Sequence, residues 1–127
     1  MPTFEEVAAL ALELPEVIES TSYGTPALKV GKRGGLIARL RSEDGALVLR
    51  IDPDDRDALL TERPDVYYLT PHYEYYLTPH YEGAPYVLVR LEVADLAELG
   101  DLVFEAWQAV APRRALLARQ ERAGVRP

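Results

Sequence analysis

Residues 27–51 read ALKVGKRGGLIARLRSEDGALVLRI and contain three short segments rich in β-branched and other apolar residues. Two polar stretches, GKRGG and RSEDG, separate these segments, and their glycines suit the positive-φ positions of tight turns. The pattern therefore predicts an antiparallel meander with the strands Ala27–Val30, Leu36–Leu40 and Ala46–Ile51.

A helix is predicted on the N-terminal side of this meander. Thr3 and Glu6 have the spacing of a capping box, and apolar residues recur at helical intervals from Phe4 until Pro15. The stretch ESTSYGTP, residues 19–26, is rich in Ser, Thr, Gly and Pro. We expect it to be a connection between the helix and the first strand.

A second helix and a second strand pair are predicted on the C-terminal side. Asp52 supplies an N-cap and Pro53 occupies the first helical position of a helix that runs to about Glu62. Two segments rich in aromatic and β-branched residues follow and are predicted to be strands: Tyr67–Thr70 and Tyr86–Glu92.

The last predicted element is a long helix. Asp95 and Glu98 have a capping spacing, and an apolar stripe follows that includes Trp107, which we interpret as a core anchor. Pro112 either kinks this helix or begins an arginine-rich extension over residues 112–127. The predicted order is α-β-β-β-α-β-β-α, which indicates an α+β fold with an antiparallel sheet packed by helices.

Composition is typical of one soluble domain spanning residues 1–127. The chain has 127 residues, of which 48% are hydrophobic and 28% are charged. It contains no cysteine, which excludes disulfides, thiolate nucleophiles and cysteine-ligated metal sites. No apolar run approaches the roughly 18 residues that a membrane-spanning helix needs. We expect a cytoplasmic protein without a membrane partner, a metal site or a cofactor.

Charge is distributed unevenly along the chain, whose net charge is −7. Residues 20–42 carry five basic and no acidic residues, whereas residues 43–110 carry four basic and fifteen acidic residues. Residues 111–127 are basic again, with five arginines and one glutamate. Two basic stretches in an acidic chain indicate either a local anion-binding surface or scattered surface arginines.

Residues 67–82, YYLTPHYEYYLTPHYE, are one octapeptide written twice. One copy is sufficient for the predicted strand and turn, so we interpret the second as a recent duplication or an engineered insertion. His72 and His80 are the two histidines, and seven of the eight tyrosines lie between Tyr67 and Tyr86. Such tyrosines favour either packing on a sheet face or a surface that stacks single-stranded bases or binds a protein.

The element order and several motifs together resemble the MmcQ/YjbR family. These motifs are LPEVIESTSYGTPALKVGKRGGLIARL (14–40), LVLRIDPDDRDALL (47–60), YYLTPHY (67–73) and PYVLVRL (85–91), followed by the helix that contains Trp107. The resemblance covers about residues 3–111. It implies the YjbR-like, secretion-chaperone-like α+β fold, also described as DUF419-like, and a predicted DNA-binding role in which hairpins act as a double wing.

The resemblance and the charge pattern give the leading hypothesis, a small non-enzymatic protein that binds nucleic acid through a basic β-hairpin. Lys and Arg side chains at a wing tip would contact phosphates. The candidate residues are Lys29, Lys32, Arg33, Arg39 and Arg41, with Arg113 and Arg114 as a second patch. Because no predicted helix carries the side chains that read base edges, we expect backbone-dominated and salt-sensitive binding.

Two alternatives stay open. The first is an adaptor that captures a protein or peptide by strand addition at a sheet edge and with the tyrosine-rich hairpin. The second is a small-ligand binder or enzyme that uses a histidine of the TPHY motif. The surface that would serve either role contains His72, Tyr73, His80 and Tyr81. No residue is identified as catalytic, and the sequence leaves the oligomeric state open.

Overall fold

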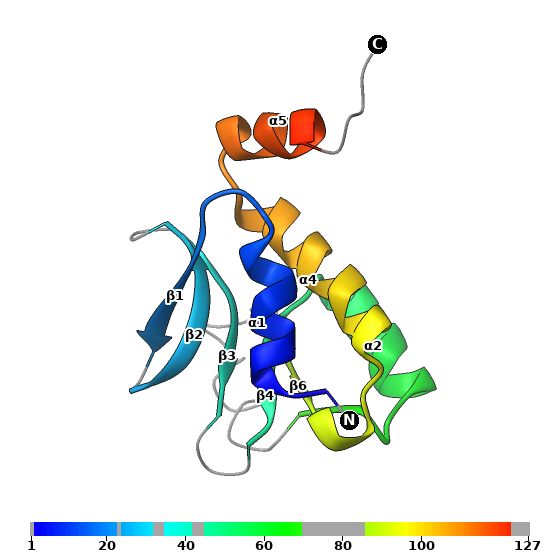
Figure 1. The fold of residues 1–127 in the computed structure, drawn as a ribbon. Helices are drawn as coiled ribbons and strands as arrows, with labels where there is room; N and C mark the ends of the chain where they lie inside the picture. The colour runs from blue at the N-terminus through cyan, green and yellow to red at the C-terminus, as the bar shows by residue number, and fades with distance from the viewer. Residues whose placement is uncertain (1, 23, 32–34, 42–44, 70–85, 123–127) are drawn as a thin grey trace, which may run out of the picture.

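The computed structural model describes residues 2–22, 24–31, 35–41, 45–69 and 86–122. Its elements are α1 (Phe4–Leu12), β1 (Val17–Ser22), β2 (Thr25–Val30), β3 (Leu36–Leu40), β4 (Leu47–Arg50), α2 (Pro53–Glu62), β5 (Tyr67–Tyr68), β6 (Tyr86–Val89), the 3-10 helix η1 (Leu91–Val93), α4 (Leu96–Val110) and α5 (Arg113–Arg122). Helices pack against an antiparallel sheet (Figure 1). The predicted α+β class is therefore confirmed.

The described strands form one sheet with the order β1-β2-β3-β4-β6-β5. Strands β1 to β4 follow one another as a meander, and β6 then pairs with β4, which leaves β5 at the far edge. Helices α1 and α4 lie side by side across one face of the sheet, and α2 packs near β5 and β6 (Figure 1). All four described α-helices contribute side chains to one hydrophobic core on this side of the sheet.

Side-chain caps fix where the helices begin, as the sequence predicts. The Thr3 hydroxyl accepts a hydrogen bond from the Glu6 amide at 3.2 Å, and the Glu6 carboxylate accepts one from the Thr3 amide at 3.0 Å. Asp52 accepts from the amide of Asp54 at 2.8 Å. These bonds satisfy amide groups that the first turn of a helix leaves without partners.

Trp107 anchors the core, which confirms its predicted role. Its side chain is 1% exposed, and its Nε1 donates a hydrogen bond to the Pro15 carbonyl at 3.0 Å. The indole therefore joins α4 to the segment that leaves α1, and its polar atom has a partner although it is buried.

The segment predicted as a connection is largely a strand. Residues 17–22 form β1, which pairs with β2 from Val17 opposite Val30 to Ser22 opposite Thr25. Polar residues are tolerated in this strand because it lies at the edge of the sheet, where only one side is paired among the described strands. The prediction placed too much weight on Ser and Thr content, whereas the β-branched Val17, Ile18 and Thr21 favour extended structure.

Pro112 ends α4 and begins a separate helix. Ala111, the residue before the proline, is extended with a ψ of 141°, because the proline ring disfavours a helical conformation there. Helix α5 then starts at Arg113 and buries Ala115 completely. Among the described residues, no helix has the length and apolar character that crossing a membrane requires.

Candidate nucleic-acid interface

Two rows of residues run across the sheet, one on each face. The first row is aligned across β2, β3, β4 and β6, belongs to the core, and consists of Leu28, Ala38, Leu49 and Val87. The second row is aligned in the same way and consists of Ala27, Arg39, Val48, Leu88 and Tyr68. Successive side chains of a strand point to opposite faces. The second row therefore lies on the face away from the helices, which we call the outer face.

The outer face is basic. Side chains alternate between the two faces along a strand. A residue that lies two positions before or after a member of the second row therefore points to the same face. By this alternation, the outer face carries Lys29, Arg39, Arg41, Arg50 and Arg90, and all five are half-buried. Within the described strands, no position that points to this face holds Asp or Glu.

The contacts of Arg90 fix it on this face. Its guanidinium carbon lies 4.1 Å from the centre of the Tyr68 ring. One of its Nη atoms donates hydrogen bonds to the carbonyl oxygens of Pro64 at 3.2 Å and Asp65 at 3.3 Å. The contact with Tyr68, which belongs to the second row, agrees with the position that strand alternation gives to Arg90.

The outer face also includes apolar residues that are buried. Ala27, Val48 and Leu88 are at most 2% exposed, yet they lie outside the core cluster on the helix side. Aliphatic stems of Lys and Arg can bury such residues while the charged ends stay near solvent. Arg41 lies deeper, since its Nε and one Nη are shielded from solvent. The basic residues of this face can thus serve both packing and anion binding.

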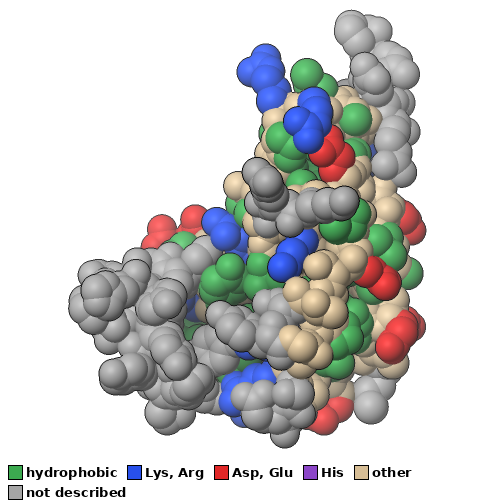
Figure 2. Space-filling model, turned by 90° about the vertical axis from the view of Figure 1, so that its left-hand side faces the viewer, with side chains coloured by type: hydrophobic (Ala, Val, Ile, Leu, Met, Phe, Trp, Pro, Cys, Tyr) green, Lys and Arg blue, Asp and Glu red, His purple; other side chains and the backbone are tan. Residues whose placement is uncertain are grey.

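In the described part of the chain, many acidic residues lie on the helices. Helix α1 carries Glu5 and Glu6, α2 carries Asp54, Asp55 and Asp57, and α4 carries Glu98, Asp101 and Glu105. Figure 2 shows Asp and Glu side chains along its right-hand side and also at its upper left, and Lys and Arg side chains near the middle and at the α5 end. Seven of the fifteen acidic residues in 43–110 therefore lie on α2 and α4, which pack on the core side of the sheet.

The structure brings three of the predicted residues together and adds two. Lys29, Arg39 and Arg41 share the outer face, as described above. Arg50 and Arg90 were missed because charge was summed along the chain, and both lie within the acidic block. The signal that could have found them is strand alternation, since each follows a buried residue of the second row by two positions.

Arg113 and Arg114 lie elsewhere, on α5 at the end of the molecule where α4 terminates (Figure 1). Arg114 makes two hydrogen bonds to the Glu16 carboxylate, each at 2.7 Å. Glu16 has a φ of 65°, and its carbonyl accepts from the Gly31 amide at 2.8 Å. Arg114 thus ties α5 to the α1–β1 link, whereas Arg113 is exposed.

Several predictions fall outside the described residues. Lys32 and Arg33 belong to the β2–β3 connection, and the tip of the predicted wing lies there. His72, Tyr73, His80 and Tyr81 belong to residues 70–85. Roles assigned to these residues, and to the duplicated octapeptide beyond Leu69, stay predictions.

A polar cluster ties β5 to α4 on the core side. The buried Tyr67 hydroxyl donates a short hydrogen bond to the Glu98 carboxylate, which also pairs with Arg63 at 3.3 Å. Burial, followed by the bond to Glu98, raises the pKa of Tyr67 well above its ordinary value. We interpret this cluster as a structural link, because the second carboxylate oxygen of Glu98 neutralises the Arg63 cation.

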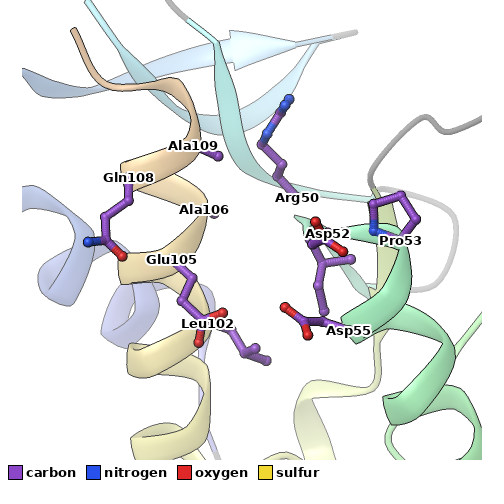
Figure 3. A pocket seen from close by; sticks show the side chains of 10 residues that line it. Arg50, Asp52, Pro53, Asp55, Leu102, Glu105, Ala106, Gln108 and Ala109 are labelled. Atoms are coloured by element: carbon purple, nitrogen blue, oxygen red, sulfur yellow. The ribbon is translucent and has the colours of Figure 1, made fainter. Parts of the chain in front are cut away.

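A cleft of about 540 Å³ separates α4 from the start of α2 (Figure 3). Asp55 and Glu105 approach the gap from α2 and α4, whereas Arg50 extends away from them (Figure 3). No group of three or more His, Cys, Asp or Glu side chains that could hold a metal ion occurs in the described part of the chain. The charged side chains that line the cleft thus include Asp55 and Glu105.

Comparisons with known proteins agree with this architecture. Uncharacterized proteins of Mycobacterium tuberculosis and Mycobacterium bovis are each 36% identical to this chain, over 93% of it and 95% of their own length. The crystal structure of a Deinococcus radiodurans protein with a DUF419 domain has the same fold, with a TM-score of 0.69, 21% identity and coverage of 98% of this chain and 89% of that one. Residues 12–109 match the YjbR family. The chain therefore belongs to the YjbR family.

Proposed function

We propose that this protein is a small, non-enzymatic protein of the cytoplasm that binds the sugar-phosphate backbone of nucleic acid on its outer face. One observation carries the proposal. Strand alternation collects Lys29, Arg39, Arg41, Arg50 and Arg90 on one face of the sheet, while many of the described acidic residues lie on helices that pack on the other side.

The separation of charge makes binding compatible with a net charge of −7. Phosphate contacts act over short distances at physiological salt, because the screening length is about 8 Å. Acidic helices behind the sheet then repel a polyanion weakly, and they favour its approach from the basic side. We expect affinity that depends steeply on salt and little on sequence.

A fluorescence-anisotropy titration tests this proposal. Labelled oligonucleotides are titrated at low and moderate salt with the wild type and with Lys29→Gln/Arg39→Gln, which removes two charges from the outer face. The logarithm of the affinity is expected to fall linearly with the logarithm of salt concentration. The slope should drop by about 1.5 in the variant, since each lost phosphate contact removes roughly 0.7–0.9.

A matched control changes net charge by two on the helix side. Glu13 and Glu105 are exposed on or next to α1 and α4, and Glu13→Gln/Glu105→Gln should leave the salt slope unchanged. Circular dichroism and thermal melting check that both variants fold. Absence of binding at low salt, or a slope that is the same in both double variants, would overturn the proposal.

A second candidate function is peptide capture at β1. This six-residue strand lies at the sheet edge and pairs only with β2 among the described strands. An extended peptide could add to it through backbone hydrogen bonds. Such binding would persist at high salt, which separates it from binding of nucleic acid.

A further inference from the structure

Two tyrosines share the outer face with the basic residues. Tyr68 lies opposite Leu88 on β6, and Tyr86 lies two positions before Leu88 on the same strand, opposite Arg50. Tyr68 and Tyr86 are therefore diagonal neighbours across the β5–β6 pair, about 7–8 Å apart along the sheet. Both side chains are half-buried.

These two tyrosines are not needed by the core on the helix side. The residue next to each of them in sequence, Tyr67 and Val87, points into that core and is at most 1% exposed. The aromatic rings of Tyr68 and Tyr86 instead lie among Arg50, Arg90 and the apolar Leu88. A half-buried aromatic ring among cations is suited to stack against another planar group.

Arg90 and Tyr68 form a cation–π contact on this face. The guanidinium lies over the ring at 4.1 Å and is held by the carbonyl oxygens of Pro64 and Asp65. Nucleic-acid bases stack on guanidinium planes as well as on aromatic rings. Arg90 and Tyr68 thus form one fixed platform, and Tyr86 lies beside it.

Stacking on a sheet requires bases with accessible flat faces. In a duplex these faces are covered by neighbouring base pairs, whereas in a single strand they can turn outward. We infer that the outer face binds single-stranded nucleic acid, with phosphates at Lys29, Arg39 and Arg50 and bases stacked at Tyr86 and at the Tyr68–Arg90 platform. This inference rests on the proposed function and names the ligand class.

The arrangement also indicates low sequence specificity. The outer-face positions of the described strands contain no Asn or Gln, the side chains that pair with the edge of adenine. Stacking tolerates every base, since all of them present a π face. We expect similar affinities for single strands of different sequence.

The test compares four ligands of about 12 nucleotides, a length within the usual site sizes. They are single-stranded DNA, single-stranded RNA, the matched DNA duplex and a single strand of the same length without bases. The proteins are the wild type, Tyr86→Leu and Tyr86→Phe. Anisotropy gives the affinities, and a single strand that contains 2-aminopurine reports stacking through fluorescence quenching.

Single strands are expected to bind at least several times more tightly than the duplex or the baseless strand. Tyr86→Leu should weaken binding of single strands roughly ten-fold and reduce quenching, without change of the salt slope. It should leave binding of the baseless strand unchanged. Tyr86→Phe keeps the ring and should behave as the wild type, which separates stacking from a merely structural role.

The outcomes distinguish this inference from the proposed function. Equal, salt-sensitive binding of duplex and single strands, unaffected by Tyr86→Leu, would overturn the inference and leave the proposed function standing. Absence of binding of all four ligands at low salt would overturn both. Loss of baseless-strand binding in Tyr86→Leu would also contradict the inference, because that ligand has nothing to stack.

Discussion

The two faces of one sheet differ in what their side chains do, although the same strands supply both. On the helix side, Leu28, Ala38, Leu49 and Val87 form an apolar row inside the core. On the outer face, the adjacent row of Ala27, Arg39, Val48 and Leu88 is bordered by basic and aromatic side chains. The period of two along a strand thus places core packing residues on one face and the candidate binding residues on the other.

The largest expected difference between the faces concerns two leucines that are both 0% exposed. Leu49 lies in the core, whereas Leu88 lies in the outer row. Leu49→Ala is expected to cost about 4 kcal/mol of unfolding free energy, because the rigid core collapses only partly around the cavity. Leu88→Ala is expected to cost about 2 kcal/mol, because flexible Lys and Arg stems can move into the space. Urea denaturation of both variants measures the two values.

Equal losses of unfolding free energy for the two leucine variants would contradict the expected difference between the two faces. The outer row would then be a second rigid core, and its basic residues would be held mainly by packing. Unchanged denaturant m-values in both variants are required for the comparison, since a changed m-value would indicate a different unfolded or native state.

A loss of unfolding free energy of intermediate size is expected when Tyr67, the core-side neighbour of Tyr68, is substituted. Tyr67→Phe removes the hydrogen bond to Glu98 and should cost about 1–2 kcal/mol at neutral pH. The raised pKa of Tyr67 makes the unfolding free energy depend on pH. Above about pH 10, the unfolded chain loses this proton while the folded protein keeps it, so unfolding becomes easier as pH rises.

The cost of Tyr67→Phe should therefore shrink between about pH 9 and pH 11, because the wild type loses this contribution and the variant has none to lose. Urea midpoints of both proteins across this range measure the change. Tyr86→Phe, which removes a hydroxyl from the outer face, should stay within about 0.5 kcal/mol of the wild type at neutral pH. A cost at Tyr67 that grows with pH would contradict the assignment of its raised pKa.

Local signals predicted most of the fold, and long-range pairing decided the rest. Caps at Thr3, Asp52 and Asp95 and the glycine turns around β3 are encoded by neighbouring residues, so the sequence predicted these elements. Strand β1 is polar because it is an edge strand, and that position depends on which strands pair. The amino-acid composition of this segment is typical of a loop, and it gives no information on whether the segment lies at the edge of a sheet.

The candidate interface was predicted only in part, because some of its residues come together only through strand pairing. Lys29, Arg39 and Arg41 were found as a basic run, which is a local feature of the sequence. Arg50 and Arg90 join them only through the pairing of β3 with β4 and β4 with β6. The register that places Tyr68 diagonally across from Tyr86 also needed the folded sheet.

The smallest expected effect concerns Arg113, a member of the second basic patch that the sequence predicts. Arg113 is exposed on α5, which packs at the end of α4 and not on the outer face (Figure 1). A cation makes the salt dependence of binding steeper only where it contacts a phosphate. Arg113→Gln should therefore change affinity by less than roughly two-fold, while Lys29→Gln reduces the slope by about 0.7 with a single strand.

Both single variants remove one positive charge. A difference between them therefore reports the position of the charge and not the net charge of the protein. An equal fall in slope for Arg113→Gln and Lys29→Gln would mean that the ligand contacts α5 as well. The interface would then extend over the α4 end of the molecule, and the outer face alone would no longer account for binding. An effect of Arg113→Gln that disappears at about 0.15 M salt would instead indicate long-range attraction, because charges are then screened beyond about 8 Å.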